Sequence, residues 1–313
     1  MRELTSTVTG SDWQPKVTAI VPCFNAAAFL GPTLDCLAAQ TWPKLEILIG
    51  DDASSDDTLA IARDFAAARE EVRIVARESN LGWLRNCNDL MSRTTSELMF
   101  FAFHDDLVDP TYVEKLVAAL RNRPEAVLAF SDIEVVKLDG SRHVWVFDEL
   151  SGLTGSLARG LVMAGRHKGW WVPVHGLFRS EAFHRIGGIK PNARGEYSAD
   201  WTWLLHMVLL GEFVRVQEVL CRKFEKHSSL SRTWPRDRAA RNSLRLAGIR
   251  EIRRSPLGFA SKAVLVAYLT PKVDLRRRVP IRVKALLKKL LGLKVRRSVG
   301  RTTSSAGERI APR

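Results

Sequence analysis

Short apolar runs alternate with segments of helical spacing along the first part of the chain. A run that is apolar at nearly every position predicts a strand buried on both faces, because a strand with one solvated face alternates instead. Between these runs, apolar residues such as Leu34, Leu37 and Ala38 recur at helical spacing. The runs that predict strands are Val17–Pro22, Leu45–Gly50, Val72–Val75 and Leu98–Phe103.

Strands and helices that alternate in this order predict an α/β fold with a mostly parallel central sheet and helices on both faces. Beyond residue 110 the pattern is less regular. Apolar runs at Ala126–Ser131 and Trp170–Phe178 predict two further strands, and Asp200 opens a strongly apolar helix, Trp201–Leu210. The second half therefore belongs to the same domain but departs from strict alternation.

The net charge of +14 is unevenly distributed. Residues 236–313 hold 22 Lys and Arg against 4 Asp and Glu, a balance of +18, whereas residues 1–235 hold 26 against 30, a balance of −4. Residues 1–15 are polar without any period. We therefore expect an N-terminal arm (1–15), a main domain (16–235) and a basic helical C-terminal extension (236–313).

The extension contains a predicted amphipathic helix that suits an anionic membrane surface. A solvated charged helix would show the same spacing. Binding of nucleic acid is disfavoured, because residues 1–235 are acidic in balance and no aromatic residues interleave with the basic run. The apolar positions of the helix are Val283, Leu286, Leu287, Leu290 and Leu291, and the basic ones are Lys284, Lys288 and Lys289.

Cysteine usage and the N-terminus indicate the compartment. The four cysteines show no C-x-x-C spacing, so neither a zinc site nor a disulfide framework is indicated, and a reducing cytosol is expected. The N-terminus lacks the basic and then apolar order of a signal peptide, and no run reaches the ~18 apolar residues of a spanning helix. We expect a cytoplasmic protein that contacts the inner face of the membrane peripherally.

Polar side chains follow the first two predicted strands directly. Ligands of open α/β sheets bind outside the carboxyl ends of the strands, so we expect both loops to line one pocket. Pro22, Phe24 and Asn25 bring a strand end, an aromatic ring and an amide to it. Asp52 brings a carboxylate that can accept hydrogen bonds from ribose hydroxyls or a base N–H, whereas Asp51 can equally form a turn.

The turn at residues 80–82 precedes a helical stretch that carries Arg85 and Asn88. These residues would offer backbone amides, a side-chain amide and one cation to a diphosphate. A glycine turn before a helix would look the same. The sequence contains neither G-x-G-x-x-G after the first strand nor G-x-x-x-x-G-K-[ST] anywhere, so no glycine-rich loop is available for the phosphates.

Asp105 and Asp106 stand at the end of the fourth predicted strand. Two carboxylates this close repel each other unless a cation lies between them. Mn²⁺ or Mg²⁺ meets that need and also binds phosphate oxygens, so the pair predicts a metal site for a nucleotide-activated donor. An acidic turn before the helix at Tyr112 is the other interpretation.

Asp200, between Ala199 and Trp201 at the start of the apolar helix, is the candidate general base. Partial desolvation there would raise its basicity, and it could deprotonate an acceptor hydroxyl. A helix N-cap is a compatible structural role.

Taken as an ordered set, these motifs resemble glycosyltransferase family 2, whose members have the GT-A fold. The likeness covers residues 16 to about 235, with 16–110 as the nucleotide-binding half and 111–235 as the acceptor-binding half. It rests on Val17–Asn25, Gly50–Thr58, Asn80–Asn88 and His104–Asp106.

The resemblance implies a metal-dependent, inverting hexosyl transfer from a nucleotide-diphospho-sugar to an acceptor hydroxyl of a glycan or lipid-linked acceptor, in cell-surface glycan or polysaccharide synthesis. Asp52 would contact the base or ribose. His104-Asp105 replaces a strict D-x-D, with Asp105 as the metal-contacting carboxylate and Asp106 as a weaker partner. Asp200 takes the position of the family's catalytic base, although Ala199 replaces the usual acid before it.

Two further points accompany the resemblance. His227, with Ser228 and Ser231, resembles the family's short H-x-x-x-S closing segment. Nucleotidyl transfer on the same fold is an alternative chemistry, but it calls for a glycine-rich loop after the first strand, where this chain has Cys23-Phe24-Asn25.

Overall fold

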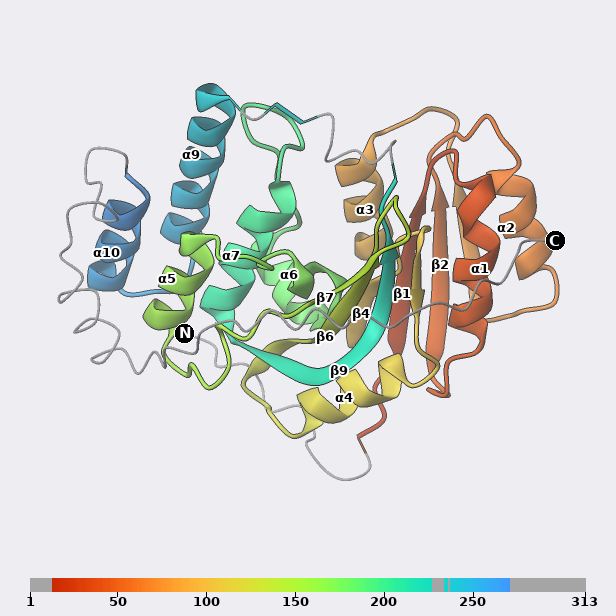
Figure 1. Ribbon diagram of the computed structural model, residues 1–313, viewed down its shortest axis with the longest axis horizontal. Helices are drawn as coiled ribbons and strands as arrows, with labels where there is room; N and C mark the ends of the chain where they lie inside the picture. The colour runs from red at the N-terminus through yellow and green to blue at the C-terminus, as the bar shows by residue number, and fades with distance from the viewer. Residues whose placement is uncertain (1–12, 227–233, 236, 271–313) are drawn as a thin grey trace. The chain divides into compact units, whose positions relative to one another are not determined.

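The structure is a computed structural model that describes residues 13–226, 234–235 and 237–270. The predicted helix at 283–291 and the segment from His227 to Ser231 lie outside the described residues. Figure 1 shows the order of elements along the chain. The strands are β1 (Val17–Cys23), β2 (Leu45–Asp51), β3 (Val72–Ala76), β4 (Leu98–Phe101), β5 (Asp106–Val108), β6 (Ala126–Val136), β7 (Arg142–Trp145), β8 (Leu177–Arg179) and β9 (Glu212–Phe224).

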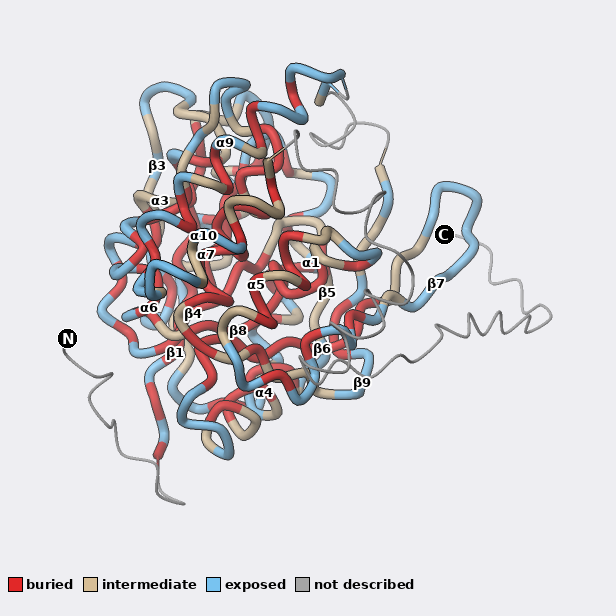
Figure 2. The backbone as a smooth tube through the Cα atoms, turned by 90° about the vertical axis from the view of Figure 1, so that its left-hand side faces the viewer, coloured by how far each residue is buried: buried red, intermediate tan, exposed pale blue. Residues whose placement is uncertain are grey.

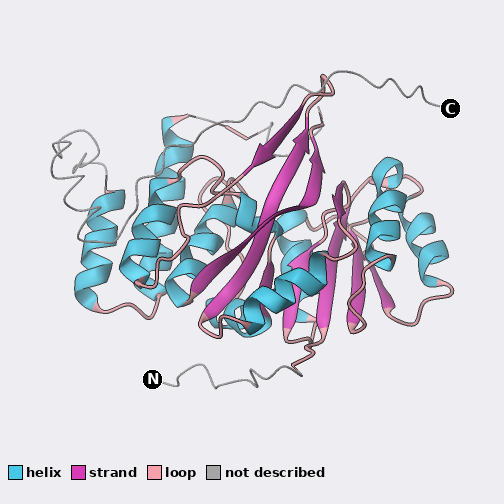
Figure 3. Cartoon of the chain, turned by 60° about the horizontal axis from the view of Figure 1, so that its bottom comes forward, coloured by secondary structure: helices cyan, strands magenta, loops and turns pink. Residues whose placement is uncertain are grey.

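The helices connect these strands and flank the sheet (Figure 3). In the first half, α3 packs against β1 and β2, whereas α2 packs against β2 and β3 and beside α1. The described helices are α1 (Ala27–Ala38), α2 (Thr58–Ala66), α3 (Trp83–Ser92), α4 (Tyr112–Arg121), α5 (Ser156–Gly165), the 3₁₀ helix η1 (Val172–His175), α6 (Ser180–Ile186), α7 (Ala199–Leu210), α9 (Arg238–Arg254) and α10 (Phe259–Leu269).

The strands of the sheet follow the order β3-β2-β1-β4-β8-β6-β9-β5, and β7 pairs with β6 outside this order. The pairs among β3, β2, β1 and β4 are parallel, as the alternating pattern predicts, and β6 and β9 also pair in parallel. Strands β5, β7 and β8 pair antiparallel to their neighbours. The α/β class and the parallel pairing of the first half are therefore confirmed.

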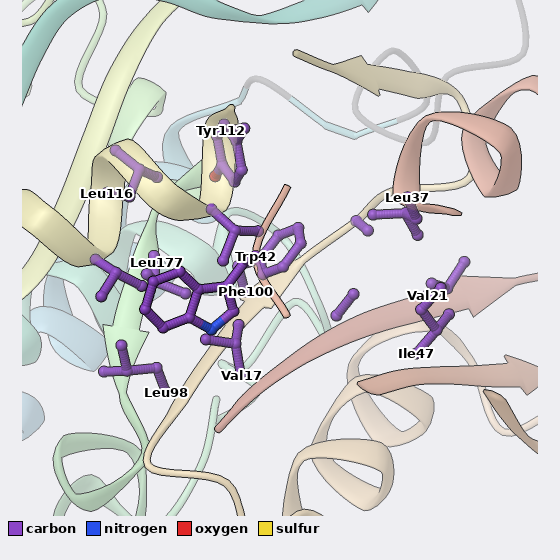
Figure 4. Packing of buried hydrophobic residues seen from close by; sticks show 14 of the residues in the cluster. Val17, Val21, Leu37, Trp42, Ile47, Leu98, Phe100, Tyr112, Leu116 and Leu177 are labelled. Atoms are coloured by element: carbon purple, nitrogen blue, oxygen red, sulfur yellow. The ribbon is translucent and has the colours of Figure 1, made fainter. Parts of the chain in front are cut away.

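The burial of β1 and β4 explains why these two strands could be predicted from the sequence. Every residue of β1 and β4 is buried, and Figure 2 shows the buried positions concentrated along the central strands. Figure 4 shows the packing between sheet and helices, where Phe100 and Tyr112 meet with ring centroids 5.3 Å apart. An uninterrupted apolar run is the sequence counterpart of such two-sided burial.

The predicted strand at Trp170–Phe178 is wrong over most of its length. The chain forms the 3₁₀ turn η1 there, and only Leu177–Arg179 joins the sheet as β8. Pro173 explains the difference, because its nitrogen cannot donate a ladder hydrogen bond and its φ is restricted. The apolar run Trp170–Phe178 therefore corresponds to a buried turn followed by a short strand.

Helices α9 and α10 pack beside the main sheet domain (Figure 1). Helix α9 contacts α7, and α10 contacts both α9 and α5. A buried pair, His206 Nδ1 and Glu251 Oε2 at 2.9 Å, joins α7 to α9. The division of the chain at residue 235 remains a prediction. Helices α7 and α9, which lie on either side of that residue in the sequence, are in direct contact.

At the N-terminal end, part of the predicted arm is docked. Trp13 is buried, its carbonyl accepts a hydrogen bond from Arg121, and the carbonyl of Pro15 accepts one from Trp42 Nε1.

Candidate functional site

The carboxyl ends of β1, β2 and β4 bring the predicted acidic side chains to one edge of the sheet. Cys23 and Asp51 end β1 and β2 and are paired in register. Burial, followed by the negative charges of Asp51, Asp105 and Asp56, raises the pKa of the Cys23 thiol. The loops after β1, β2 and β4 therefore share one electrostatic neighbourhood around Cys23.

The two aspartates after β2 have different surroundings. Both carboxylate oxygens of Asp52 accept backbone N–H groups, from Leu81 at 2.8 Å and from Gly82 at 2.9 Å. Asp51 accepts only a longer bond, from Ser54 N–H at 3.3 Å, and its buried Oδ1 has no hydrogen-bond partner among the described residues. Asp52 thus holds the loop before α3, while Asp51 retains an open acceptor.

The loop after β1 is fastened to the loop after β2. Asn25, at a φ of 48°, accepts the Ser55 N–H at 2.9 Å and donates its own N–H to Ser54 at 2.9 Å. The Pro22 carbonyl lies 3.0 Å from His104 Nδ1. This contact connects β1 to the acidic loop, the segment His104, Asp105 and Asp106 that follows β4. Phe24 is 47% exposed, so its ring is accessible at the surface.

Residues at the start of α3 have mainly structural partners. The side-chain amide of Asn88 makes two hydrogen bonds with the backbone of Ile189. It donates to the Ile189 carbonyl at 2.7 Å and accepts the Ile189 N–H at 2.8 Å. Arg85 is exposed. Glu196, which the sequence reading did not single out, accepts the Leu84 N–H at 2.8 Å and so caps α3. No local sequence signal could have identified this cap, because Glu196 lies 112 positions from Leu84 along the chain.

Asp105 and Asp106 occupy different environments. Asp106 is buried, with Oδ1 at 3.3 Å from Lys223 Nζ and Oδ2 at 3.0 Å from His175 Nε2. Burial opposes ionisation, yet the charge of Lys223 and the contact with His175 hold the pKa of Asp106 below its usual range. Asp105 is partly exposed, and its Oδ2 lies 2.7 Å from Lys226 Nζ.

His175 is a site residue that the sequence reading missed. It lies in η1, is 7% exposed, and sits edge-on to Phe103 and Trp171. Its carbonyl accepts the Tyr112 hydroxyl. A lone histidine within an apolar run is an ordinary core residue from sequence alone, so only its position against Asp106 reveals it.

Asp200 lies in the first turn of α7, after Ser198 in a left-handed conformation with a φ of 47°. Burial raises the pKa of Asp200 to about 6, offset in part by the Trp201 N–H at 2.9 Å and by the charges of Arg166 and His175. His175 therefore contributes to the electrostatic surroundings of both Asp106 and Asp200. A carboxylate with this pKa is ionised at neutral pH and is a stronger base than an ordinary aspartate.

The donor atoms fit a divalent ion that is shared with a substrate. Within the described ranges, no three His, Cys, Asp or Glu side chains gather into a metal cage. Mg²⁺ and Mn²⁺ that bind through one or two carboxylates and substrate phosphates need no such cage. Asp105 fits this mode, because its carboxylate is partly exposed at the strand end. Asp106 faces two protein partners, and its predicted metal role remains a prediction.

Three comparisons with known proteins bear on the site. Residues 18–173 match the model of the family described as glycosyl transferase family 2. The chain is 30% identical over 107 residues to the putative glycosyltransferase EpsE of Bacillus subtilis, covering 34% of this chain and 38% of that protein. It is 26% identical over 131 residues to that organism's putative teichuronic acid biosynthesis glycosyltransferase TuaG, covering 42% and 52%.

These alignments span well under two thirds of each relative's length. Among solved structures, TarS 1–349 of S. aureus in complex with UDP-GlcNAc superposes with a TM-score of 0.64 at 16% identity, covering 88% of this chain and 80% of that one. The mannosyltransferase PcManGT of Pyrobaculum calidifontis, in complex with GDP-Man and Mn²⁺, gives a TM-score of 0.50 at 17% identity, covering 90% and 81%. With the parallel half-sheet and the acidic loop after β4, these likenesses identify the chain as a glycosyltransferase that belongs to family 2 and has the GT-A fold.

Proposed function

We propose that the enzyme transfers a hexosyl group from a nucleotide-diphospho-sugar to an acceptor hydroxyl with inversion of configuration. The observation that carries this proposal is Asp200, whose pKa of about 6 suits a general base and whose charge interacts with His175 beside the acidic loop. The solved structures with UDP-GlcNAc and GDP-Man support a nucleotide-sugar as the donor class. Glycan or polysaccharide synthesis is the process we expect.

In this reaction Asp200 accepts the proton of the acceptor hydroxyl while that oxygen attacks the anomeric carbon. Attack comes from the face opposite the diphosphate, so configuration inverts in a single displacement. A positioned base of this kind contributes roughly 10²–10⁴ in rate. The apolar start of α7 supports the role, because desolvation favours the neutral acid that proton transfer produces.

Asp105 is the residue that we propose for the metal, Mn²⁺ or Mg²⁺, with Asp106 holding the loop in place. When bound, such an ion would offset the negative charge on the departing diphosphate. For the nucleoside, the open Oδ1 of Asp51 is a better acceptor than Asp52, whose two oxygens already hold Leu81 and Gly82. Phe24 and Asn25 complete this side of the donor site, while Arg85 and Asn88 stay predicted contacts.

The donor class is tested by screening nucleotide-sugars for thermal stabilisation and for hydrolysis, with and without Mn²⁺. We expect one donor to stabilise the protein and to be hydrolysed slowly. Incorporation of a nucleoside monophosphate into an acceptor would support nucleotidyl transfer instead. Anomeric NMR of the transfer product then reports inversion.

We further propose that α9 and α10 contribute to peripheral contact with an anionic membrane. The outer face of α10 exposes apolar side chains, with Phe259 89% and Val264 47% exposed. Lys262 donates to the carbonyl of Arg253, so basic groups adjoin that face. Apolar side chains beside arginine and lysine suit a headgroup boundary better than they suit nucleic acid. No described helix is both long and apolar enough to cross a bilayer.

Flotation with vesicles of anionic or neutral lipid tests this contact. We expect the wild-type protein to float with anionic vesicles, and Phe259→Ala combined with Lys262→Gln to float less. An equal distribution of both proteins would argue against it.

A further inference from the structure

Two lysines at the end of β9 neutralise the acidic loop. Lys223 Nζ lies 3.3 Å from Asp106 Oδ1, and Lys226 Nζ lies 2.7 Å from Asp105 Oδ2. The second pair is only partly shielded, with side-chain exposures of 15% for Lys226 and 13% for Asp105. The ammonium of Lys226 also lies 4.3 Å from the centroid of the Phe29 ring. The carboxylate that fits a metal is therefore already paired with a cation from the protein.

The pairing differs in kind between the two aspartates. Asp106 is buried and its carboxylate faces both His175 and Lys223. Its backbone carbonyl accepts a hydrogen bond from the Thr33 hydroxyl at 3.1 Å, so Asp106 is fixed in position. Asp105 is less enclosed, and its ion pair comes from a residue two positions beyond the end of β9. A lysine holds its charge on a long stem and makes no bidentate contact, so it can change partner without moving the backbone.

We propose that Lys226 and the divalent ion exchange at Asp105, and that the displaced ammonium of Lys226 then binds the diphosphate of the donor. The inference rests on the proposed donor and metal. An ion held by Asp105 together with a diphosphate would bring the phosphates to Asp105, and so within reach of the Lys226 side chain that pairs with it. Phosphate oxygens are natural partners of a lysine ammonium.

This exchange makes metal binding dependent on the nucleotide. Without a nucleotide, a divalent ion must displace Lys226 from Asp105, which removes the ion pair between the two side chains. With a nucleoside diphosphate present, the phosphates attract both cations, so each keeps an anionic partner. Lys226 thus lowers the affinity for the ion alone and raises the affinity for the nucleotide and the ion together.

Isothermal titration calorimetry on the full chain separates these effects. Mn²⁺ is titrated alone, and UDP and GDP are titrated in the presence of Mn²⁺, into wild type and Lys226→Gln. We expect the variant to bind Mn²⁺ alone roughly tenfold more tightly or better, and to bind the preferred nucleotide roughly tenfold less tightly. Lys226→Arg, which keeps the charge, should behave like wild type toward Mn²⁺ alone.

Lys115→Gln is the matched control, because Lys115 also pairs with a carboxylate, Glu218, but on the exposed surface. It should leave both affinities unchanged. Unchanged affinities in a folded Lys226→Gln protein would overturn the exchange. If neither nucleotide binds wild type with Mn²⁺, the proposed donor class fails instead, and Mn²⁺ binding by Lys226→Gln still reports on the pairing at Asp105.

Discussion

Asp200 is held in a state that favours its proposed role as a base and destabilises the fold at neutral pH. Burial raises its pKa from an ordinary 3.8 to about 6. One pKa unit corresponds to about 1.4 kcal/mol, so a difference of roughly 2 units gives an upper limit of about 3 kcal/mol. Because the side chain is partly exposed, solvent screening reduces the effect, and we expect about 1–2 kcal/mol.

The sign follows from which state holds the proton. A carboxyl group whose pKa is raised by folding contributes its full stability below the unfolded pKa, near 3.8, and loses it as pH rises through 6. Asp200→Asn cannot ionise. We therefore expect the variant to be more stable than wild type above pH 6, with a gain in Tm of roughly 2–6 °C that shrinks as the pH is lowered toward 4.

Calorimetric scans at pH 8 and pH 4.5 measure this gain, and steady-state transfer assays measure kcat on the same samples. The variant should lose roughly 10²–10⁴ in kcat and keep its affinity for the donor. Wild-type kcat should rise with pH with a midpoint near pH 6 and then level off, since Asp200 must be ionised to accept a proton. Asp139→Asn, at an exposed turn where hydrogen bonds from Ser141 lower the pKa, should show no gain in stability. A variant that is less stable than wild type at pH 8, or that retains wild-type kcat, would refute the reasoning.

Two further predictions concern the scaffold. Asp52→Ala leaves the Leu81 and Gly82 N–H groups without their acceptor, so we expect a loss of about 1–3 kcal/mol in urea unfolding together with weaker donor binding; an unchanged midpoint would show that these bonds are replaced. Glu251→Ala leaves His206 buried without its partner, and we expect the free energy of unfolding to fall by up to roughly 3–5 kcal/mol. Truncation after residue 235, which removes Glu251, should lower the free energy of unfolding as well, whereas truncation after residue 270 should not. Equal unfolding midpoints for the two truncations would contradict the integral role of α9.

Much of the N-terminal part of the fold could be predicted because its determinants are local. Two-sided burial leaves an uninterrupted apolar run, so β1 and β4 could be located with their following loops. Parallel strands bring their carboxyl ends to one edge, which made the proximity of Asp51, Asp52 and Asp105 predictable. Strand β9 was not identified, because its 13 residues mix buried, intermediate and exposed positions in no regular alternation.

By itself, the sequence determined the α/β class, the acidic loop after β4 and the candidate base at the start of α7. Tertiary structure alone decided how these groups are paired. Lys223 and Lys226 reach the acidic loop from more than 100 positions along the chain, and His175 does so from a turn that reads as a strand. Charge pairing across such separations depends on which strands become neighbours in the sheet, and β9 pairs with β5 through contacts that no local pattern encodes.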